Sequence, residues 1–269
     1  MEISDAAYVS EKLLQFKSEF QIEISPDWGE GSDGTWQKGK WVKTELDRLY
    51  ESVSLFAETA GGSANFIKNI GGARVLKTNI GSHGGEAVAH LVRLSDTVNF
   101  DAWTIVHEFA HAWDANCRWQ LSVALEKYTG GSTNYVLGFL KRLFKKTDSG
   151  LFKAEKIPGR YGRLPGANAF GYFYGDKPGG ADWNFNRRED FAECVAMYVG
   201  WNRNNALSAH AHARVERFLL PNEAKDNYFG QVDNWEDYAP YFYPEGGDYS
   251  RTKRWQFIDG LVTGRITLT

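Results

Sequence analysis

This chain of 269 residues has few cysteines, no excess of basic charge and no long apolar run. Its two cysteines, Cys117 and Cys194, exclude a disulfide scaffold and a structural zinc cluster. The formal net charge of −3 provides no electrostatic footprint for nucleic acid. No apolar stretch approaches the roughly 20 residues that span a bilayer. Hydrophobic residues still make up 42% of the chain, which is enough to bury the core of a globular protein.

The first residues, MEISDAAYVSEKLL, are acidic and mixed. They lack the positive region and the continuous apolar region of an export signal. The sequence as given therefore predicts no signal peptide, whereas secretion stays open if a leader has been removed. It indicates neither the compartment nor the oligomeric state.

Strand and helix signals alternate in the N-terminal part of the chain. Apolar residues at alternating spacings of four and three predict a helix over residues 41–60, ended by a glycine pair. Its apolar face comprises Val42, Leu46, Leu49, Val53 and Phe56. Residues 63–78 are typical of two short strands joined at a second glycine pair. Residues 81–86 form a glycine-rich loop, and residues 87–96 are a further strand candidate.

Helices are predicted to dominate after residue 100. They span residues 102–125, 135–146, 188–201 and 206–219. Asn99 or Asp101 is the expected N-cap of the first of them. A glycine-rich connection over residues 149–186 is long enough to indicate a functional role. Because strands gather before residue 100 and helices after it, the sequence predicts an α+β fold.

Residues 104–114, TIVHEFAHAWD, place two histidines four residues apart on a predicted helix. Residues at this spacing lie on one helical face, so His107 and His111 can direct two imidazoles at one metal ion. Glu108 projects to the side, where its carboxylate can reach a metal-bound water. This is the zinc pattern H-E-x-x-H, which combines neutral nitrogen ligands with a carboxylate base.

A five-residue pattern with three fixed positions also arises by chance. The flanking residues favour a metal, because they are uncharged and predict a buried helix. They are Thr104, Ile105, Val106, Phe109, Ala110, Ala112 and Trp113. Two histidines and a glutamate in such a helix need partners, since a buried charge without a partner is costly. A bound metal ion would supply them.

A catalytic zinc site has three protein ligands and an open position, so a third ligand is needed. One route places this ligand six residues after His111, with a glycine between them that turns the chain back. Cys117 stands at that position, but Asp114 stands where the glycine is expected. Without the turn the helix is predicted to continue. Cys117 is therefore the weaker candidate, and a buried thiol is the simpler interpretation.

The other route is a carboxylate from a separate helix. Residues 184–199, NFNRREDFAECVAMYV, carry Glu189 and Glu193 on one helical face among apolar residues. One of them can bind the metal while the other accepts the N–H of a ligating histidine. Glu189 also stands three residues after Asn186, which is close to a capping-box spacing. If Glu189 caps its own helix, Glu193 becomes the ligand.

Together, HEFAHAWD and EDFAE resemble the gluzincin metallopeptidases, and most closely the family of the anthrax lethal factor catalytic domain and the Pro-Pro endopeptidases. The resemblance is specific over these two motifs and only architectural over the rest of residues 87–201. It implies that His107, His111 and Glu189 bind zinc and that Glu108 is the general base.

The resemblance also assigns roles to two further acids. Glu193 would support a ligating histidine, and Asp114 would anchor the active-site helix, with a solvent-exposed Asp114 as the alternative. The implied fold is zincin-like, and the strand before the active-site helix is a sheet edge. Residues 87–94 match that place, where an extended peptide or protein substrate would pair as an added strand.

The family carries an oxyanion-stabilising tyrosine seven residues before the glutamate ligand, and this chain departs from that pattern. The corresponding residue is Asp182, and the nearest upstream tyrosines are Tyr172 and Tyr174. A glycine-rich loop can bring either hydroxyl into the site, because oxyanion donors act by placement. Ordinary packing is an equal alternative for both.

These features predict a zinc-dependent endopeptidase with one Zn²⁺ per chain. Glu108 would take a proton from the attacking water and later pass it to the leaving amine. A rival hypothesis is a catalytically inactive zincin-like module that binds a partner or a sugar through aromatic residues of the tail. These are Trp235, Tyr238, Tyr241, Phe242 and Tyr243. A zinc amidase with a non-peptide substrate would use the same motifs.

The expected domain organisation follows from these motifs. Residues 1–35 form an N-terminal extension, which is an inhibitory segment, an additional substrate lobe or padding. The catalytic domain spans residues 36–220, with a sheet lobe over residues 36–100 and a helical lobe over residues 101–220. Residues 221–269 form an aromatic-rich, mostly irregular tail that packs on the domain.

Overall fold

The protein has a mixed α+β fold, as the sequence predicts. The computed structural model describes residues 5–25, 29–30, 36–37, 41–81, 83–129, 187–201, 207–209, 211 and 248–267. They belong to two compact units, one mostly before and one mostly after residue 120. The expected helices 135–146 and 206–219, the connection 149–186 and most of the tail lie wholly or largely outside the described residues.

The first unit contains a four-stranded sheet with the order β1-β4-β6-β5. Strands β1 (Glu23–Ile24), β4 (Arg74–Thr78) and β6 (Leu91–Ser95) are parallel. Strand β5 (Gly85–Val88) runs antiparallel to β6 and forms one edge of this sheet. A separate two-stranded sheet joins β2 (Gly29–Glu30) to β3 (Trp36–Gln37).

The single strand predicted over residues 87–96 is wrong. Its residues hold the end of β5, a two-residue turn at Ala89 and His90, and then β6, because Val88 pairs with Leu91. Strand β6 lies inside the sheet, so the edge strand predicted over residues 87–94 is also wrong, and the edge belongs to β5. Ala89 makes the turn with φ = 53° and without a glycine, so the sequence carries no hairpin signal there.

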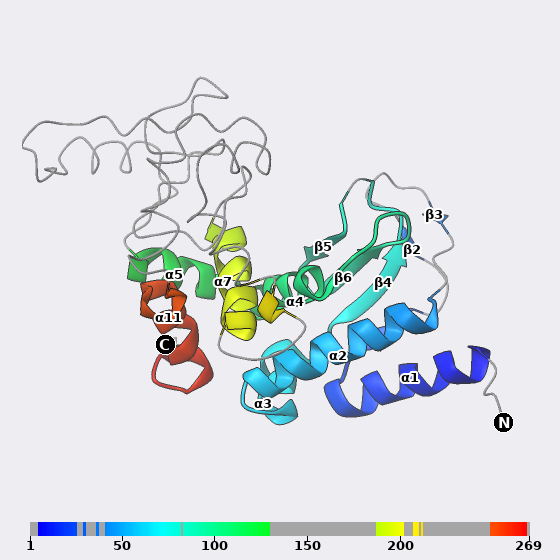
Figure 1. The fold of residues 1–269 in the computed structure, drawn as a ribbon, viewed down its shortest axis with the longest axis horizontal. Helices are drawn as coiled ribbons and strands as arrows, with labels where there is room; N and C mark the ends of the chain where they lie inside the picture. The colour runs from blue at the N-terminus through cyan, green and yellow to red at the C-terminus, as the bar shows by residue number, and fades with distance from the viewer. Residues whose placement is uncertain are drawn as a thin grey trace, which may run out of the picture. The chain divides into compact units, whose positions relative to one another are not determined.

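Four helices complete the first unit, with α1 and α2 beside one another (Figure 1). They are α1 (Asp5–Phe20), α2 (Lys43–Thr59), α3 (Ser63–Ile70) and α4 (Ala102–Asn116). Helix α2 confirms the prediction for residues 41–60, except that Val42 precedes it and is exposed. The first of the two strands predicted over residues 63–78 is wrong, because it is α3. Phe66 and Ile70, four residues apart, form its buried face.

Aromatic residues of these helices form the centre of the core. Phe66 of α3 packs edge-on against Phe20 of α1 and Phe56 of α2, with ring centroids 5.7 and 5.6 Å apart. Phe109 and Trp113 of α4 pack against Phe66 and Phe56, at 6.3 and 6.2 Å. Residues before position 36 thus contribute to the same core as the motif helix.

The second unit contains three helices and a short 3-10 helix among its described residues. They are α5 (Gln120–Thr129), α7 (Arg187–Trp201), η1 (Tyr249–Arg251) and α11 (Lys253–Val262). Helix α7 confirms the prediction for residues 188–201. The prediction of an irregular tail is wrong over α11. This helix begins after Thr252, and the Thr252 hydroxyl accepts a hydrogen bond from the backbone amide of Trp255 at 3.0 Å.

A fully buried ion pair joins α7 to α11. Arg254 donates from Nε and Nη2 to the two carboxylate oxygens of Asp190, each at 2.8 Å, and both side chains have no exposed area. The Cys194 thiol donates to the same carboxylate at 3.4 Å. Asp190 is therefore held from two sides, at the residue directly after Glu189.

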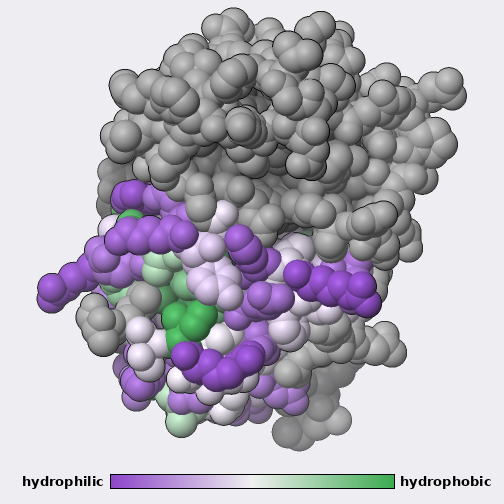
Figure 2. Space-filling view, turned by 90° about the vertical axis from the view of Figure 1, so that its left-hand side faces the viewer, coloured by the Kyte–Doolittle hydropathy of each residue, from purple (hydrophilic) through white to green (hydrophobic). Residues whose placement is uncertain are grey.

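None of the described helices is long and apolar enough to cross a bilayer. On the face shown in Figure 2, the described surface is mainly hydrophilic, with a small apolar area among polar side chains. Small apolar areas of this kind are normal on protein surfaces and are not evidence for a binding site.

Replacing Arg254 with methionine is expected to lower the free energy of unfolding by about 3–5 kcal/mol, because it leaves Asp190 as a buried charge without its cation. Urea unfolding of wild type and variant measures the difference. Arg251→Met is the matched control, since Arg251 pairs with Asp248 at 3.2 Å on the surface. The control should lose less than about 1 kcal/mol. Equal losses in the two variants would contradict the role of the buried pair.

Candidate metal centre

Helix α4 begins at Asp101, one of the two predicted N-caps. The Asp101 carboxylate accepts hydrogen bonds from the backbone amide and the hydroxyl of Thr104, at 2.8 and 2.9 Å. Asn99 has another role, because its side-chain oxygen accepts a hydrogen bond from Arg48 of α2 at 3.0 Å. The start of the motif helix is thus fixed by its own cap and by a neighbouring helix.

One face of α4 carries aromatic core residues, and the opposite face carries the two histidines. Residues two positions apart on a helix project roughly 200° apart, so Phe109 and Trp113 lie opposite His107 and His111. The aromatic pair packs into the core, which directs the histidine pair away from it. The sequence produces this arrangement by alternating two i, i+4 pairs along about two turns of helix.

The two imidazoles are close together. Their Nε2 atoms lie 3.1 Å apart, and the ring planes are inclined by 79°. In the absence of a metal, one neutral ring can donate its Nε2–H to the other, so the contact suits either a hydrogen bond or a shared ion. His111 is 7% exposed, so its imidazole is largely shielded from solvent.

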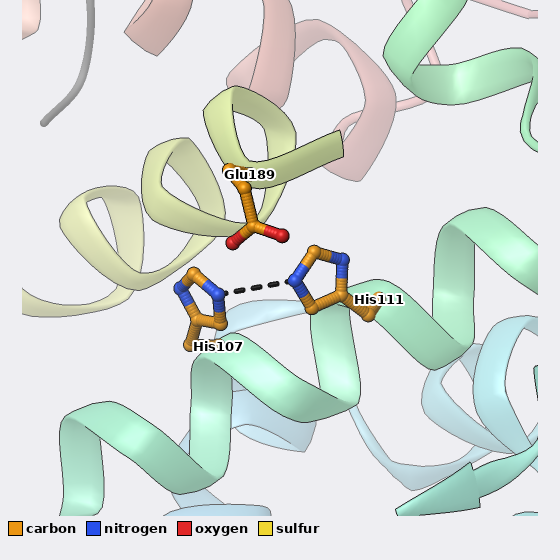
Figure 3. A group of neighbouring side chains, drawn as sticks. All are labelled: His107, His111 and Glu189. Atoms are coloured by element: carbon orange, nitrogen blue, oxygen red, sulfur yellow. Dashed lines mark hydrogen bonds between the residues drawn. The ribbon is translucent and has the colours of Figure 1, made fainter. Parts of the chain in front are cut away.

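Glu189 of α7 belongs to the same group of candidate ligands. One ligand atom each from His107, His111 and Glu189 lie within 4.8 Å of one another, and the three side chains point toward one another (Figure 3). Ligands about 2.0–2.1 Å from a tetrahedral zinc ion are separated by roughly 3.4 Å. The Nε2–Nε2 distance of 3.1 Å is close to this separation, and two imidazoles with a carboxylate fit zinc in number and chemistry.

Among the described residues, no other acid or cysteine joins this group. Glu193, one turn farther along α7, is 6% exposed and is not part of it. The structure thus brings together the predicted set of three ligands, whose binding of zinc stays a prediction. Asn186, on which the capping-box alternative depends, lies outside the described part of the chain.

The side chain of Glu108 extends from α4 to the edge strand β5. Its side chain is 6% exposed. A Cβ atom added to Gly85, the first residue of β5, would lie 2.8 Å from its Cγ and 3.1 Å from its Oε1. The predicted base is therefore packed directly against the sheet edge, beside the histidine pair on the same helix. The sequence marked this glycine only as part of a loop.

Asp114 is fully buried, so the solvent-exposed alternative is wrong. It lies three residues after His111, on the same side of α4. The role predicted for it, anchoring the helix, stays a prediction.

The helix expected to run through residue 125 ends at Asn116. Arg118 and Trp119 adopt left-handed conformations, with φ of 54° and 62°, and the Trp119 amide donates to the carbonyl of Asp114 at 2.7 Å. The chain therefore turns without a glycine. Cys117 nevertheless remains outside the ligand group. Burial, together with the charge of Asp114, raises the pKa of its thiol.

The oxyanion candidates Tyr172 and Tyr174, and Asp182 at the family's tyrosine position, lie outside the described residues. Comparison of the chain with known protein families, with curated proteins and with solved structures found no match.

Cys117 is expected to react slowly with iodoacetamide at neutral pH, because a raised pKa keeps the thiol protonated. Mass spectrometry of the alkylated protein against pH should give a midpoint above the ordinary value of about 8.5. Cys194, which is fully buried with a pKa raised by burial, should react only after unfolding. Cys117→Ser should keep its metal. A midpoint below the ordinary value, or metal loss in Cys117→Ser, would restore Cys117 as a ligand candidate.

Proposed function

We propose that this protein is a zinc-dependent peptidase. The observation that carries the proposal is the grouping of His107, His111 and Glu189, with Glu108 on the same helix as the two histidines. The chemistry of this donor set supports zinc over magnesium or calcium, which prefer all-oxygen ligands. The resemblance of the two motifs to gluzincins supports the same function and a zincin-like fold.

Each of these residues has a separate proposed role. His107, His111 and Glu189 would hold the ion. When bound, zinc lowers the pKa of a coordinated water toward about 7 and polarises a carbonyl group. Glu108 accepts the proton of the attacking water and returns it to the leaving amine nitrogen as the peptide bond breaks. Glu193 would orient a ligand histidine by accepting its N–H, and Asp114 would anchor the active-site helix.

The substrate is proposed to bind along β5. This strand is one edge of the four-stranded sheet, so its outer backbone groups can pair with an extended peptide. Its first residue, Gly85, adjoins Glu108. A peptide that continued the sheet would therefore pass the general base. An extended backbone is the class of substrate that this edge fits, which favours a peptide over a non-peptide amide.

Glu108→Gln is expected to abolish peptide hydrolysis while preserving the fold and the metal content. The glutamine keeps the size of the side chain but cannot accept a proton, and general-base catalysis contributes about 10²–10⁴-fold. The assay follows cleavage of a mixed peptide library by mass spectrometry, with zinc added and with a chelator. Glu58→Gln, an exposed acid on α2, is the control and should keep wild-type turnover.

Retained hydrolysis in Glu108→Gln would remove Glu108 from the mechanism. Hydrolysis that survives complete chelation would contradict a zinc enzyme. Wild-type protein that binds zinc but cleaves no peptide would favour the amidase or the binding module, which differ in whether a non-peptide amide is hydrolysed.

A further inference from the structure

We infer that Gly85 is a positioning residue for Glu108: its lack of a side chain lets the edge strand lie directly on the carboxylate of the general base. The inference rests on the proposed function. It assigns a catalytic purpose to one glycine of the sequence GSHGGE, which spans residues 81–86.

The contact between Gly85 and α4 is unusually close. A Cβ atom at this position would lie 2.8 Å from Glu108 Cγ and 2.8 Å from Thr104 Cγ2, and 3.1 Å from Glu108 Oε1. Real Cβ atoms are essentially never closer than 3.0 Å to such neighbours. Any side chain at position 85 would therefore displace the strand, Glu108 or Thr104.

Gly84, the residue before it, provides an internal comparison. A Cβ atom there would lie 3.6 Å from Thr104 Cγ2 and 3.7 Å from the carbonyl oxygen of Asn99, which are ordinary contact distances. Neither Gly84 nor Gly85 has a positive φ. Backbone conformation therefore does not require glycine at either position. Position 85 requires glycine because there is no room for a Cβ atom.

The close contact restrains both the strand that would bind the peptide and the carboxylate of Glu108. Strand β5 is held by β6 on one side, through pairing of Gly85 with Leu94, and by α4 beneath it. Glu108 is held by the rigid helix and is covered by the strand, so its carboxylate has little freedom to move. A general base must lie within about 2.6–3.2 Å of the proton that it accepts. Gly85 thus sets the distance between the base and a peptide paired with β5.

Gly85→Ala and Gly84→Ala test the inference as a matched pair, since both add one methyl group to adjacent residues. We expect Gly85→Ala to lower kcat about 10- to 100-fold, because a displacement near 1 Å at the reacting atoms has an effect of this size. KM and zinc content should change little. Gly84→Ala should keep kcat within about 2-fold of wild type, since a methyl group fits there.

A second readout does not depend on activity. Melting temperatures of zinc-free wild type, Gly85→Ala, Glu108→Ala and the double variant form a double-mutant cycle. Gly85→Ala should melt at a lower temperature than wild type. Part of this loss should disappear in the Glu108→Ala background, because the truncated side chain makes room for the new methyl group. Additive shifts would show that the two residues are not in contact and would overturn the inference.

The outcomes separate the inference from the proposed function. Active wild type with an unchanged kcat in Gly85→Ala overturns the positioning role and leaves the peptidase intact. Wild type that binds no zinc and cleaves no peptide overturns the proposed function and the positioning role together. If Gly85→Ala is too unstable for kinetics, Gly85→Ala with Thr104→Ser, which removes one of the two 2.8 Å contacts, is assayed in its place. The same loss of kcat is expected.

Discussion

The contact between the His107 and His111 imidazoles is the constraint on which the candidate metal centre depends. Two ring nitrogens 3.1 Å apart, in a helix whose opposite face packs on Phe56 and Phe66, cannot both carry a proton toward each other. Either one ring donates to the other, or a cation lies between them. The aromatic packing of α4 keeps the rings together in both cases, so the histidine pair is organised by the core before any ion binds.

The neighbouring elements restrict the remaining groups in the same way. The edge strand covers Glu108, and the buried Arg254–Asp190 pair fixes the helix that carries Glu189 at the adjacent residue. Glu108 is therefore restrained by packing against the strand, and Glu189 lies on a helix that an ion pair ties to α11. Metal binding and general-base catalysis both benefit from such preorganisation, because groups that are already in place have a small free-energy cost of reorganisation.

Sequence periodicity was sufficient where one helical face dominates. It predicted α2 and α7, the start of α4 and the two histidines on one face, because a spacing of four residues has a single geometric meaning on a helix. It failed where the chain turns without glycine, at Ala89 and at Arg118, since left-handed residues of this kind leave no compositional signal. The correct edge strand and the contact of Gly85 with Glu108 are tertiary facts, and no local pattern specifies which residue a glycine must avoid.

The measurement that tests the central claim most directly is the zinc content per chain of wild type, His107→Ala, Glu189→Ala and Glu193→Ala, by elemental analysis after metal-free purification and loading. The account predicts one zinc in wild type and in Glu193→Ala, and little in His107→Ala and Glu189→Ala. Loss in Glu193→Ala with retention in Glu189→Ala would move the third ligand one turn along α7. Wild type without zinc would contradict the claim, and the imidazole contact would then be a hydrogen bond between two buried side chains.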